Sequence, residues 1–161
     1  MSIDPLLQLL RSKARHTHAE LADLLSLSES DVRAKIAEWE KDGTIVGYQA
    51  VIDPERAGDQ DVSAFIEVKL TPERGGGFDR LALRIARFEQ VTSCYLASGG
   101  YDLMVVVEGS DLREVARFVS EKLSTMDGVL STATHFRLKT YKENGFLIEG
   151  EDEPERLAVA P

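Results

Sequence analysis

The sequence is poor in the residues that build disulfides, metal sites and membrane spans. Its 161 residues include one cysteine, Cys94, and three histidines, so an internal disulfide is excluded and no CxxC or HExxH spacing exists for a metal. No apolar run approaches the roughly 20 residues that a membrane helix needs. The start, MSIDPLLQ, lacks the basic segment of a secretion signal. We therefore expect a cytoplasmic protein that has no metal, no cofactor and no membrane contact.

Basic charge is scarce as well. The net charge of −9 argues against a protein that simply coats phosphate groups. Residues 143–161 hold six acidic side chains and one basic one, which is five of the nine excess negative charges. Much of the acidity therefore belongs to the C-terminal end rather than to the rest of the chain.

Residues 17–43 have the pattern of two short helices joined by a tight turn. Thr17 with Glu20, and Ser28 with Asp31, match a capping box, in which the hydroxyl accepts from an early helix N–H and the acid reaches back. Apolar residues at three-and-four spacing predict the buried faces of both helices and the turn: Leu21, Leu24, Leu25, Leu27, Val32, Ile36 and Trp39. A preceding helix built on Leu6, Leu9 and Leu10 and a stop at Gly43 complete a helix-turn-helix domain. Residues 44–53, TIVGYQAVID, are rich in β-branched residues and predict a strand or small wing.

Beyond a polar linker at residues 54–61, the pattern predicts strand, helix, strand, strand, helix and strand. The strands are expected at 62–70, 91–97, 103–109 and 129–141, and a loop at 72–77 precedes the first helix. Two apolar stripes predict the helices, the second capped by Ser110: Phe78, Leu81, Ile85 and Phe88, then Leu112, Val115, Phe118, Val119 and Leu123. This order is the ferredoxin-like βαββαβ arrangement, an antiparallel sheet with both helices on one face.

The predicted organisation is an α+β chain with a winged helix-turn-helix at 1–53, a linker at 54–61, a ferredoxin-like domain at 62–142 and an acidic tail at 143–161. The tail has no clear period and is expected to be mobile, although Phe146, Leu147 and Ile148 offer apolar side chains for docking. Because the strand at 103–109 and Phe65 place apolar side chains on the face opposite the helices, we expect a second copy of the sheet to cover that face in a two-fold dimer. A central strand with one partly wet face is the alternative.

The whole arrangement resembles the Lrp/AsnC family of bacterial and archaeal transcription regulators over residues 3–142. The features that carry the resemblance are the helix-turn-helix, the segment Gly43-Thr44-Ile45-Val46-Gly47-Tyr48, the Asp-Pro linker and the Gly-x-Tyr-Asp hairpin of the sheet domain. The resemblance implies a RAM-type sheet domain that binds an amino-acid effector, and dimers that assemble further into octamers. It also implies double-stranded DNA as a partner.

The second helix of the helix-turn-helix is the expected reader of the DNA major groove. By resemblance, Ser30, Arg33 and Lys35 face the DNA. Residues 28–42 contain three basic and five acidic side chains, fewer bases than the family usually places there, so binding is expected to be weak, salt-dependent or reliant on avidity. Arg15 and His18 belong to a basic group in the loop before this motif that either contacts the DNA backbone or is a solvated loop: Arg11, Lys13, Arg15, His16 and His18.

The hairpin at 98–102 is the expected effector site. Glycines let backbone N–H groups approach a carboxylate, and Asp102 is an acceptor for an ammonium group. The resemblance places the effector around this hairpin and the last strand: Ser98, Gly99, Gly100, Tyr101, Asp102, Ser131, Thr132 and Thr134. The competing interpretation is a plain turn in which Asp102 satisfies its own backbone.

These observations predict a DNA-binding transcription regulator that responds to an amino acid or related metabolite. The alternative is a metabolite-binding or interaction protein whose DNA affinity is weak or lost. No nucleophile, base and orienting group form a recognisable catalytic set, so an enzyme is not expected.

Overall fold

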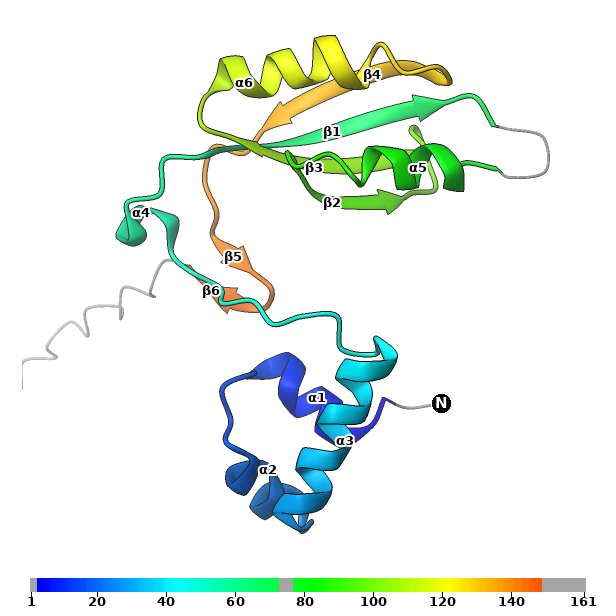
Figure 1. Ribbon diagram of the computed structural model, residues 1–161. Coiled ribbons are helices and arrows are strands. Elements are labelled where there is room, and N and C mark those ends of the chain that lie inside the picture. The colour runs from blue at the N-terminus through cyan, green and yellow to red at the C-terminus, as the bar shows by residue number, and fades with distance from the viewer. Residues whose placement is uncertain (1–2, 73–76, 149–161) are drawn as a thin grey trace, which may run out of the picture. The chain divides into compact units, whose positions relative to one another are not determined.

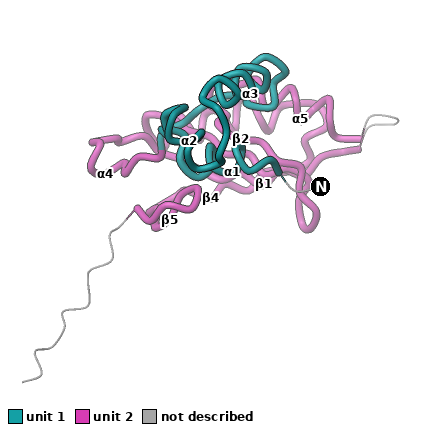
Figure 2. The backbone as a smooth tube through the Cα atoms, turned by 90° about the horizontal axis from the view of Figure 1, so that it is seen from below, with its two compact units in different colours: residues 1–50 teal, residues 51–161 magenta. Residues whose placement is uncertain are grey.

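The structure is a computed structural model that describes residues 3–72 and 77–148. The chain divides into two compact units, residues 1–50 and 51–161, which Figure 2 colours separately. Most of the loop predicted at 72–77 and most of the predicted acidic tail lie outside the described residues. Among the helices that the structure describes, none has both the length and the apolar character to cross a membrane.

Unit 1 is a three-helix bundle made of α1 (Pro5–Ser12), α2 (His18–Leu25) and α3 (Glu29–Asp42). Its core is formed by one face of each helix: Leu6, Leu10, Leu21, Ala22, Val32 and Ile36. Leu9, Leu25 and Trp39 pack against this core, as the spacing predicts. Leu24 and Leu27 do not, since they are 59% and 40% exposed. The prediction was therefore wrong to place Leu24 on the buried face of α2, because three short helices bury only a narrow stripe of one another.

The ends of the helices follow their capping residues. Thr17 forms the complete capping box with Glu20: the Thr17 hydroxyl accepts from the Glu20 N–H at 3.2 Å, and the Glu20 carboxylate accepts from the Thr17 N–H at 2.8 Å. This hydrogen bond from the Thr17 backbone holds the pKa of Glu20 below its usual value. Gly43 ends α3 in the left-handed conformation, at φ +81°, which glycine adopts without steric cost.

The predicted wing is wrong, because residues 44–53 contain no strand. Val46 in this segment is 95% exposed. Residues 44–53 instead contact α3: the Ile45 N–H donates to the Trp39 carbonyl at 2.9 Å, and the Tyr48 hydroxyl donates to Glu40 at 2.9 Å. A β-branched composition alone does not make a strand when no neighbouring strand completes the ladder.

The predicted linker at 54–61 contains a short helix, α4 (Pro54–Ala57). The Asp53 carboxylate caps it by accepting from the N–H groups of Glu55 and Arg56, and Pro54 occupies the first turn. Aspartate followed by proline is a helix start as well as a turn, so the Asp-Pro pair was interpreted too narrowly.

Unit 2 is built on a four-stranded antiparallel sheet of β1 (Val62–Leu70), β2 (Val91–Leu96), β3 (Leu103–Gly109) and β4 (Val129–Phe136). The strand order is β2-β3-β1-β4, so β1 and β3 are central. Helix α5 (Asp79–Ile85) follows β1, and α6 (Leu112–Arg117) with the π-helical turn η1 (Phe118–Leu123) follows β3. The predicted order of strands and helices is confirmed, and both helices lie on the same side of the sheet (Figure 1).

The core of unit 2 lies between this sheet and its helices. Alternate residues of the central strands face the helices and are buried: Ala64, Ile66, Val68 and Leu70 of β1, and Leu103, Val105 and Val107 of β3. The helices contribute Leu81, Ile85, Val115, Phe118 and Leu123. Leu112, predicted on the apolar side, is 55% exposed, and the cap is Asp111 rather than Ser110, because the Asp111 carboxylate accepts from two N–H groups at the helix start.

The C-terminal part of unit 2 differs from the prediction in two ways. Strand β4 ends at Phe136 rather than at Tyr141, and the first residues of the predicted tail form a small hairpin of β5 (Lys142–Glu143) and β6 (Phe146–Leu147). Asn144 and Gly145 connect these strands at φ +46° and +93°. Two positive φ values suit a two-residue turn of type I′, for which Asn-Gly is the strongest sequence signal, so this hairpin was readable from the sequence.

The capping box gives a direct test of the bundle. Replacement of Thr17 by alanine should lower the free energy of unfolding of unit 1 by about 1 kcal/mol, because the Glu20 N–H loses its acceptor. Thr17→Ser keeps the hydroxyl and should lose much less. Trp39 is the sole tryptophan and lies in this unit, so its fluorescence during urea unfolding reports the transition. Equal midpoints for the alanine and serine variants would contradict the role given to the cap.

Candidate DNA-binding helix and effector loop

The start of α3 is held by a compact group of hydroxyls and one carboxylate. The Ser28 hydroxyl accepts from the Asp31 N–H at 3.1 Å and donates to the Asp31 carboxylate at 2.6 Å. The predicted capping box is therefore only half formed, because the acid meets the hydroxyl rather than the Ser28 N–H. Ser30, predicted to face DNA, is drawn into the same group, with its oxygen 2.8 Å from that of Ser28.

The two basic residues predicted to contact DNA from α3 are both paired with acids. Arg33 is 2.7 Å from Glu29 one turn earlier on the same helix. Lys35 is 2.9 Å from Asp4, the N-cap of α1, and its ammonium also lies 5.7 Å from the ring centre of Trp39. The hydrogen bond from Lys35, followed by that from the Leu6 N–H, lowers the pKa of Asp4. Lys35 thus ties α1 to α3 in addition to facing solvent.

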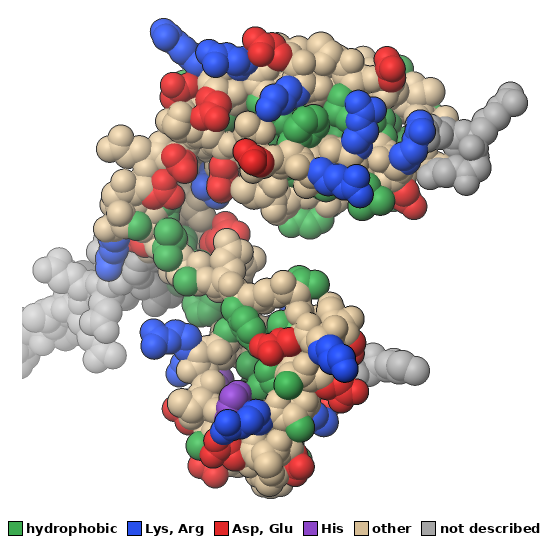
Figure 3. All heavy atoms as spheres, in the orientation of Figure 1, with side chains coloured by type: hydrophobic (Ala, Val, Ile, Leu, Met, Phe, Trp, Pro, Cys, Tyr) green, Lys and Arg blue, Asp and Glu red, His purple; other side chains and the backbone are tan. Residues whose placement is uncertain are grey.

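Acidic and basic side chains are intermixed on the visible face of unit 1 (Figure 3). Arg11 in the last turn of α1 and Lys13 and Arg15 in the following loop are exposed, whereas His18 is half-buried at the start of α2. His16 lies 3.6 Å from Glu20, and its buried Nδ1 atom makes no hydrogen bond with a described residue. Among the described residues, Arg11 and Arg15 form no ion pair with an acid, whereas Arg33 and Lys35 would have to exchange a carboxylate for a phosphate.

The hairpin loop at 98–102 is fastened to the end of β1 by Asp102. The Asp102 N–H donates to the Val68 carbonyl at 3.0 Å, and its carboxylate accepts from the Leu70 N–H at 2.7 Å. The Asp102 carbonyl accepts from the Ala97 N–H at 2.8 Å, which closes the loop. Gly99 adopts φ +142°, a conformation that glycine accommodates best, and Ser98, Gly99 and Gly100 are exposed.

The residues predicted from the last strand reach the same end of the sheet but divide between its two faces. Thr132 pairs with Val68, the residue whose carbonyl also binds the loop. Its hydroxyl lies 3.2 Å from that of Ser124, on the helix side. Ser131 pairs with Lys69 and faces the opposite side, and Thr134 pairs with Ile66, farther from the loop. The structure therefore brings Thr132 and the loop to either side of Val68. Thr134 shares the face of Thr132 but lies farther from the loop, and Ser131 faces the opposite side.

Two side-chain pairs were missed by sequence reasoning. Asp4 and Lys35 are 31 residues apart, and His135 meets Glu67 at 3.3 Å across neighbouring strands. Neither spacing has a sequence signal, because both pairs depend on how separate elements pack. Within residues 3–72 and 77–148, no group of three or more His, Cys, Asp or Glu side chains is placed to hold a metal ion.

A helix-turn-helix unit joined to a one-sided βαββαβ sheet defines a class of regulator in which one unit meets DNA and the other a small molecule. Residues 63–147 match the family model of the Lrp/AsnC ligand binding domain. The chain is 45% identical over 157 residues to the HTH-type transcriptional regulator YugG of Bacillus subtilis, which covers 97% of this chain and 95% of that protein. The chain belongs to the Lrp/AsnC family.

Solved structures agree with this assignment. A transcriptional regulator from Neisseria meningitidis in complex with L-Met is 26% identical, with a TM-score of 0.65 over 88% of this chain and 94% of that one. AsnC of E. coli is 25% identical, with a TM-score of 0.63 over 89% and 97% of the two chains. Both similarities extend across the two units, and the named relatives are regulators of transcription.

The hydrogen bond that the Asp102 side chain accepts can be tested separately from its negative charge. Asp102→Ala removes the acceptor for the Leu70 N–H and should lower the free energy of unfolding of unit 2 by about 1–3 kcal/mol. Asp102→Asn keeps a side-chain oxygen at that place and should cost less. Urea unfolding followed by far-UV circular dichroism measures both. If the alanine variant is as stable as the wild type, the loop is not held by this hydrogen bond.

Proposed function

We propose that this protein is a cytoplasmic transcription regulator that binds DNA and responds to an amino acid. The observation that carries the proposal is one chain joining a helix-turn-helix unit to a unit that matches a ligand-binding domain. The related Neisseria protein, whose structure holds L-Met, supports an amino acid as the effector class. In this proposal the backbone of residues 98–101 meets the effector from the exposed side of the loop.

The proposed regulator acts as a homodimer that assembles further, to an octamer in the form implied by the family. Support comes from the sheet face that α5 and α6 leave open. Residues opposite one another in antiparallel strands share a face, and the register places these side chains together there: Phe65 and Glu67 of β1, Met104 and Val106 of β3, Tyr95 of β2 and His135 of β4. Phe65 and Tyr95 are 38% and 59% exposed. A second sheet packed on this face would remove these rings from water.

A charge placed in this face tests the dimer. Phe65→Glu should raise the dimer dissociation constant at least about tenfold, because each protomer would bury an unpaired carboxylate. Leu83→Glu is the matched control, since Leu83 is 61% exposed on α5, on the other side of the sheet. Sedimentation equilibrium of the wild type and both variants gives the masses. The proposal fails if Phe65→Glu sediments like the wild type.

Weak, salt-sensitive DNA binding is expected of unit 1. Phosphate contacts supply most of the affinity for DNA through counterion release, and Arg33 and Lys35 each have a carboxylate within 3 Å before any DNA arrives. Both pairs are exposed, so solvent screens them and each holds its base only weakly. A phosphate can therefore replace Glu29 or Asp4, and several units in one assembly would add their small affinities.

Removing the basic members and removing an acidic member of these two ion pairs should have opposite effects on DNA affinity. Changing both Arg33 and Lys35 to alanine should abolish selective DNA binding. For the binding that remains, the slope of log affinity against log salt should become shallower by about 1.8, since each lost phosphate contact contributes about 0.9. Glu29→Gln should tighten binding, because it frees Arg33 and removes a negative charge. Fluorescence anisotropy with DNA from the chain's own upstream region, at several salt concentrations and with unrelated competitor DNA, measures all of these.

The second candidate function is a metabolite-binding or interaction protein with weak or lost DNA binding. The neutralised bases on α3 are the observation that favours it. The same titration decides between the two: selective wild-type binding that Arg33 and Lys35 control establishes the regulator. The absence of selective binding even at low salt counts against the regulator and favours the second function.

A further inference from the structure

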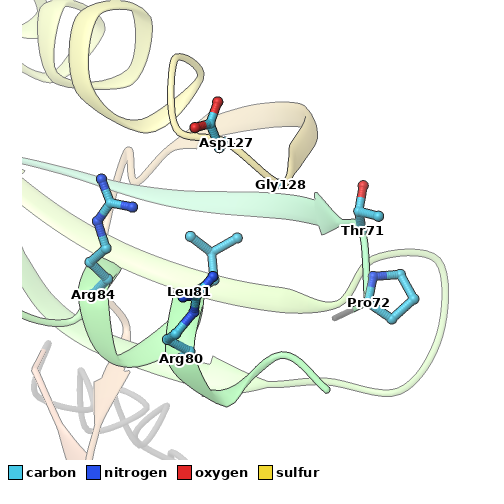
Figure 4. Close-up of a pocket in the computed structure, with 7 residues that line it drawn as sticks. All are labelled: Thr71, Pro72, Arg80, Leu81, Arg84, Asp127 and Gly128. Atoms are coloured by element: carbon cyan, nitrogen blue, oxygen red, sulfur yellow. The ribbon is translucent and has the colours of Figure 1, made fainter. Parts of the chain in front are cut away.

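The two faces of the sheet in unit 2 differ in what they carry. On the helix side the packing is close and the core is apolar: the Thr71 N–H donates to the Gly128 carbonyl at 2.8 Å, and a Cβ atom on Gly128 would lie 3.0 Å from the Leu81 side chain (Figure 4). The opposite side is the open face, where charged side chains stand among apolar ones. Its central residues are Phe65 and Glu67 of β1, Met104 and Val106 of β3, Tyr95 of β2, and Ala133 and His135 of β4.

Glu67 and His135 meet on the open face although they are not opposite one another in the ladder. The register pairs His135 with Phe65 and Glu67 with Ala133, so the two are diagonal neighbours, a spacing that long side chains can span. His135 Nε2 lies 3.3 Å from Glu67 Oε1, and among the described residues neither side chain has another ion-pair partner. The two side chains are 58% and 38% exposed, so water screens their attraction in a single protomer.

His135 is the group whose charge can change on this face near neutral pH. Histidine is the side chain that ordinarily gains or loses its proton between about pH 5 and 8. The other titratable groups of the open face stand one alternate position farther along the strands or on β2: Lys69 of β1, Glu108 of β3, Arg137 just after β4 and Tyr95 of β2. Protonation of His135 therefore decides whether the Glu67 carboxylate is paired with a cation.

A second copy of the sheet on the open face would remove this pair from water together with the apolar residues beside it. With His135 neutral, each protomer would bring an uncompensated carboxylate into the interface, which is costly, and two-fold symmetry would place two such carboxylates there. With His135 protonated, each protomer would bring an ion pair, whose attraction strengthens as water leaves. Formation of the dimer would then take up protons, so it is favoured as the pH falls and opposed as the pH rises.

We propose that the Glu67–His135 pair makes dimerisation through the open face depend on pH, with protonation of His135 tightening the dimer. This inference rests on the proposed function in one respect, that the open face is the dimer interface. It gives the regulator a second input, acidity, which acts on the assembly at a place separate from the loop proposed to meet the effector.

Sedimentation equilibrium of the full-length protein at about pH 6 and about pH 8, at one fixed salt concentration, measures the dissociation constant of the dimer. The wild-type Kd should be about tenfold lower at the lower pH, since each protomer gains a charge-assisted contact. His135→Gln removes the titrating group, so its Kd should change much less. Because acidification also reduces the net charge of −9, this variant measures how far general repulsion between two acidic protomers contributes.

Glu67→Gln is the sharpest test, because it should reverse the direction of the response. A protonated His135 would be buried without an anion in this variant, so Kd should rise on acidification relative to His135→Gln. Glu108→Gln is the matched control. It removes the same charge from an exposed position of the same face, leaves the pair intact and should keep the wild-type response.

The outcomes separate the pH dependence from the dimer itself. If the wild type and His135→Gln respond to pH alike, or if Glu67→Gln tightens on acidification as much as the wild type does, the inference is overturned. The dimer then still stands, provided that Phe65→Glu disrupts it. If the wild type is monomeric at both pH values, the dimer and its pH dependence fail together, and the DNA titration judges the rest of the proposed function.

Discussion

The sidedness of the four-stranded sheet is the constraint on which the rest of unit 2 depends. Every second residue of β1 enters the core beneath α5 and α6, while Phe65 and Glu67 point away from it. Two helices are enough to close one face, and nothing else in the described part of unit 2 closes the other. The alternation of apolar residues in the strands is therefore what supports the proposed dimer. The hairpin loop proposed to meet the effector lies at a strand end, where the backbone leaves the ladder and Asp102 fastens the loop to β1.

In unit 1, charged side chains serve both the packing of the helices and the proposed recognition of DNA. Lys35 binds the residue that caps α1, so the side chain expected to meet DNA also fixes one helix against another. Exposed ion pairs of this kind contribute little to stability, which keeps the exchange with a phosphate possible. Acidic partners on the same surface weaken non-specific attraction to DNA. Such a surface favours DNA binding through a few specific contacts over non-specific electrostatic binding.

The sequence predicted most of unit 2 because alternation and helical spacing are local signals that the fold preserves. The capping box at Thr17 was equally local. The wing failed because a strand requires a neighbour, and the cap at Asp111 was missed by one residue because serine and aspartate both favour that position. Ser131 and Thr132 were grouped together, yet adjacent strand residues face opposite sides. The ion pairs of Asp4 with Lys35 and of Glu67 with His135 depend on packing between separate segments, which no single-sequence pattern encodes.

The central position of β1 also sets the order in which the sheet is completed. Its partners are β3 and β4, which follow it in the chain by tens of residues, whereas β2 with β3 and β5 with β6 are joined by short turns. Hairpins of this kind form in roughly 1–10 μs, but β1 waits for both of its neighbours. During synthesis at about 5–20 residues per second, the interval between the end of β1 at residue 70 and the end of β4 at residue 136 lasts roughly 3–13 s. Through the first part of that time, until β3 is complete at residue 109, the apolar residues of β1 have no neighbouring strand to pair with, so their burial waits for residues far along the chain.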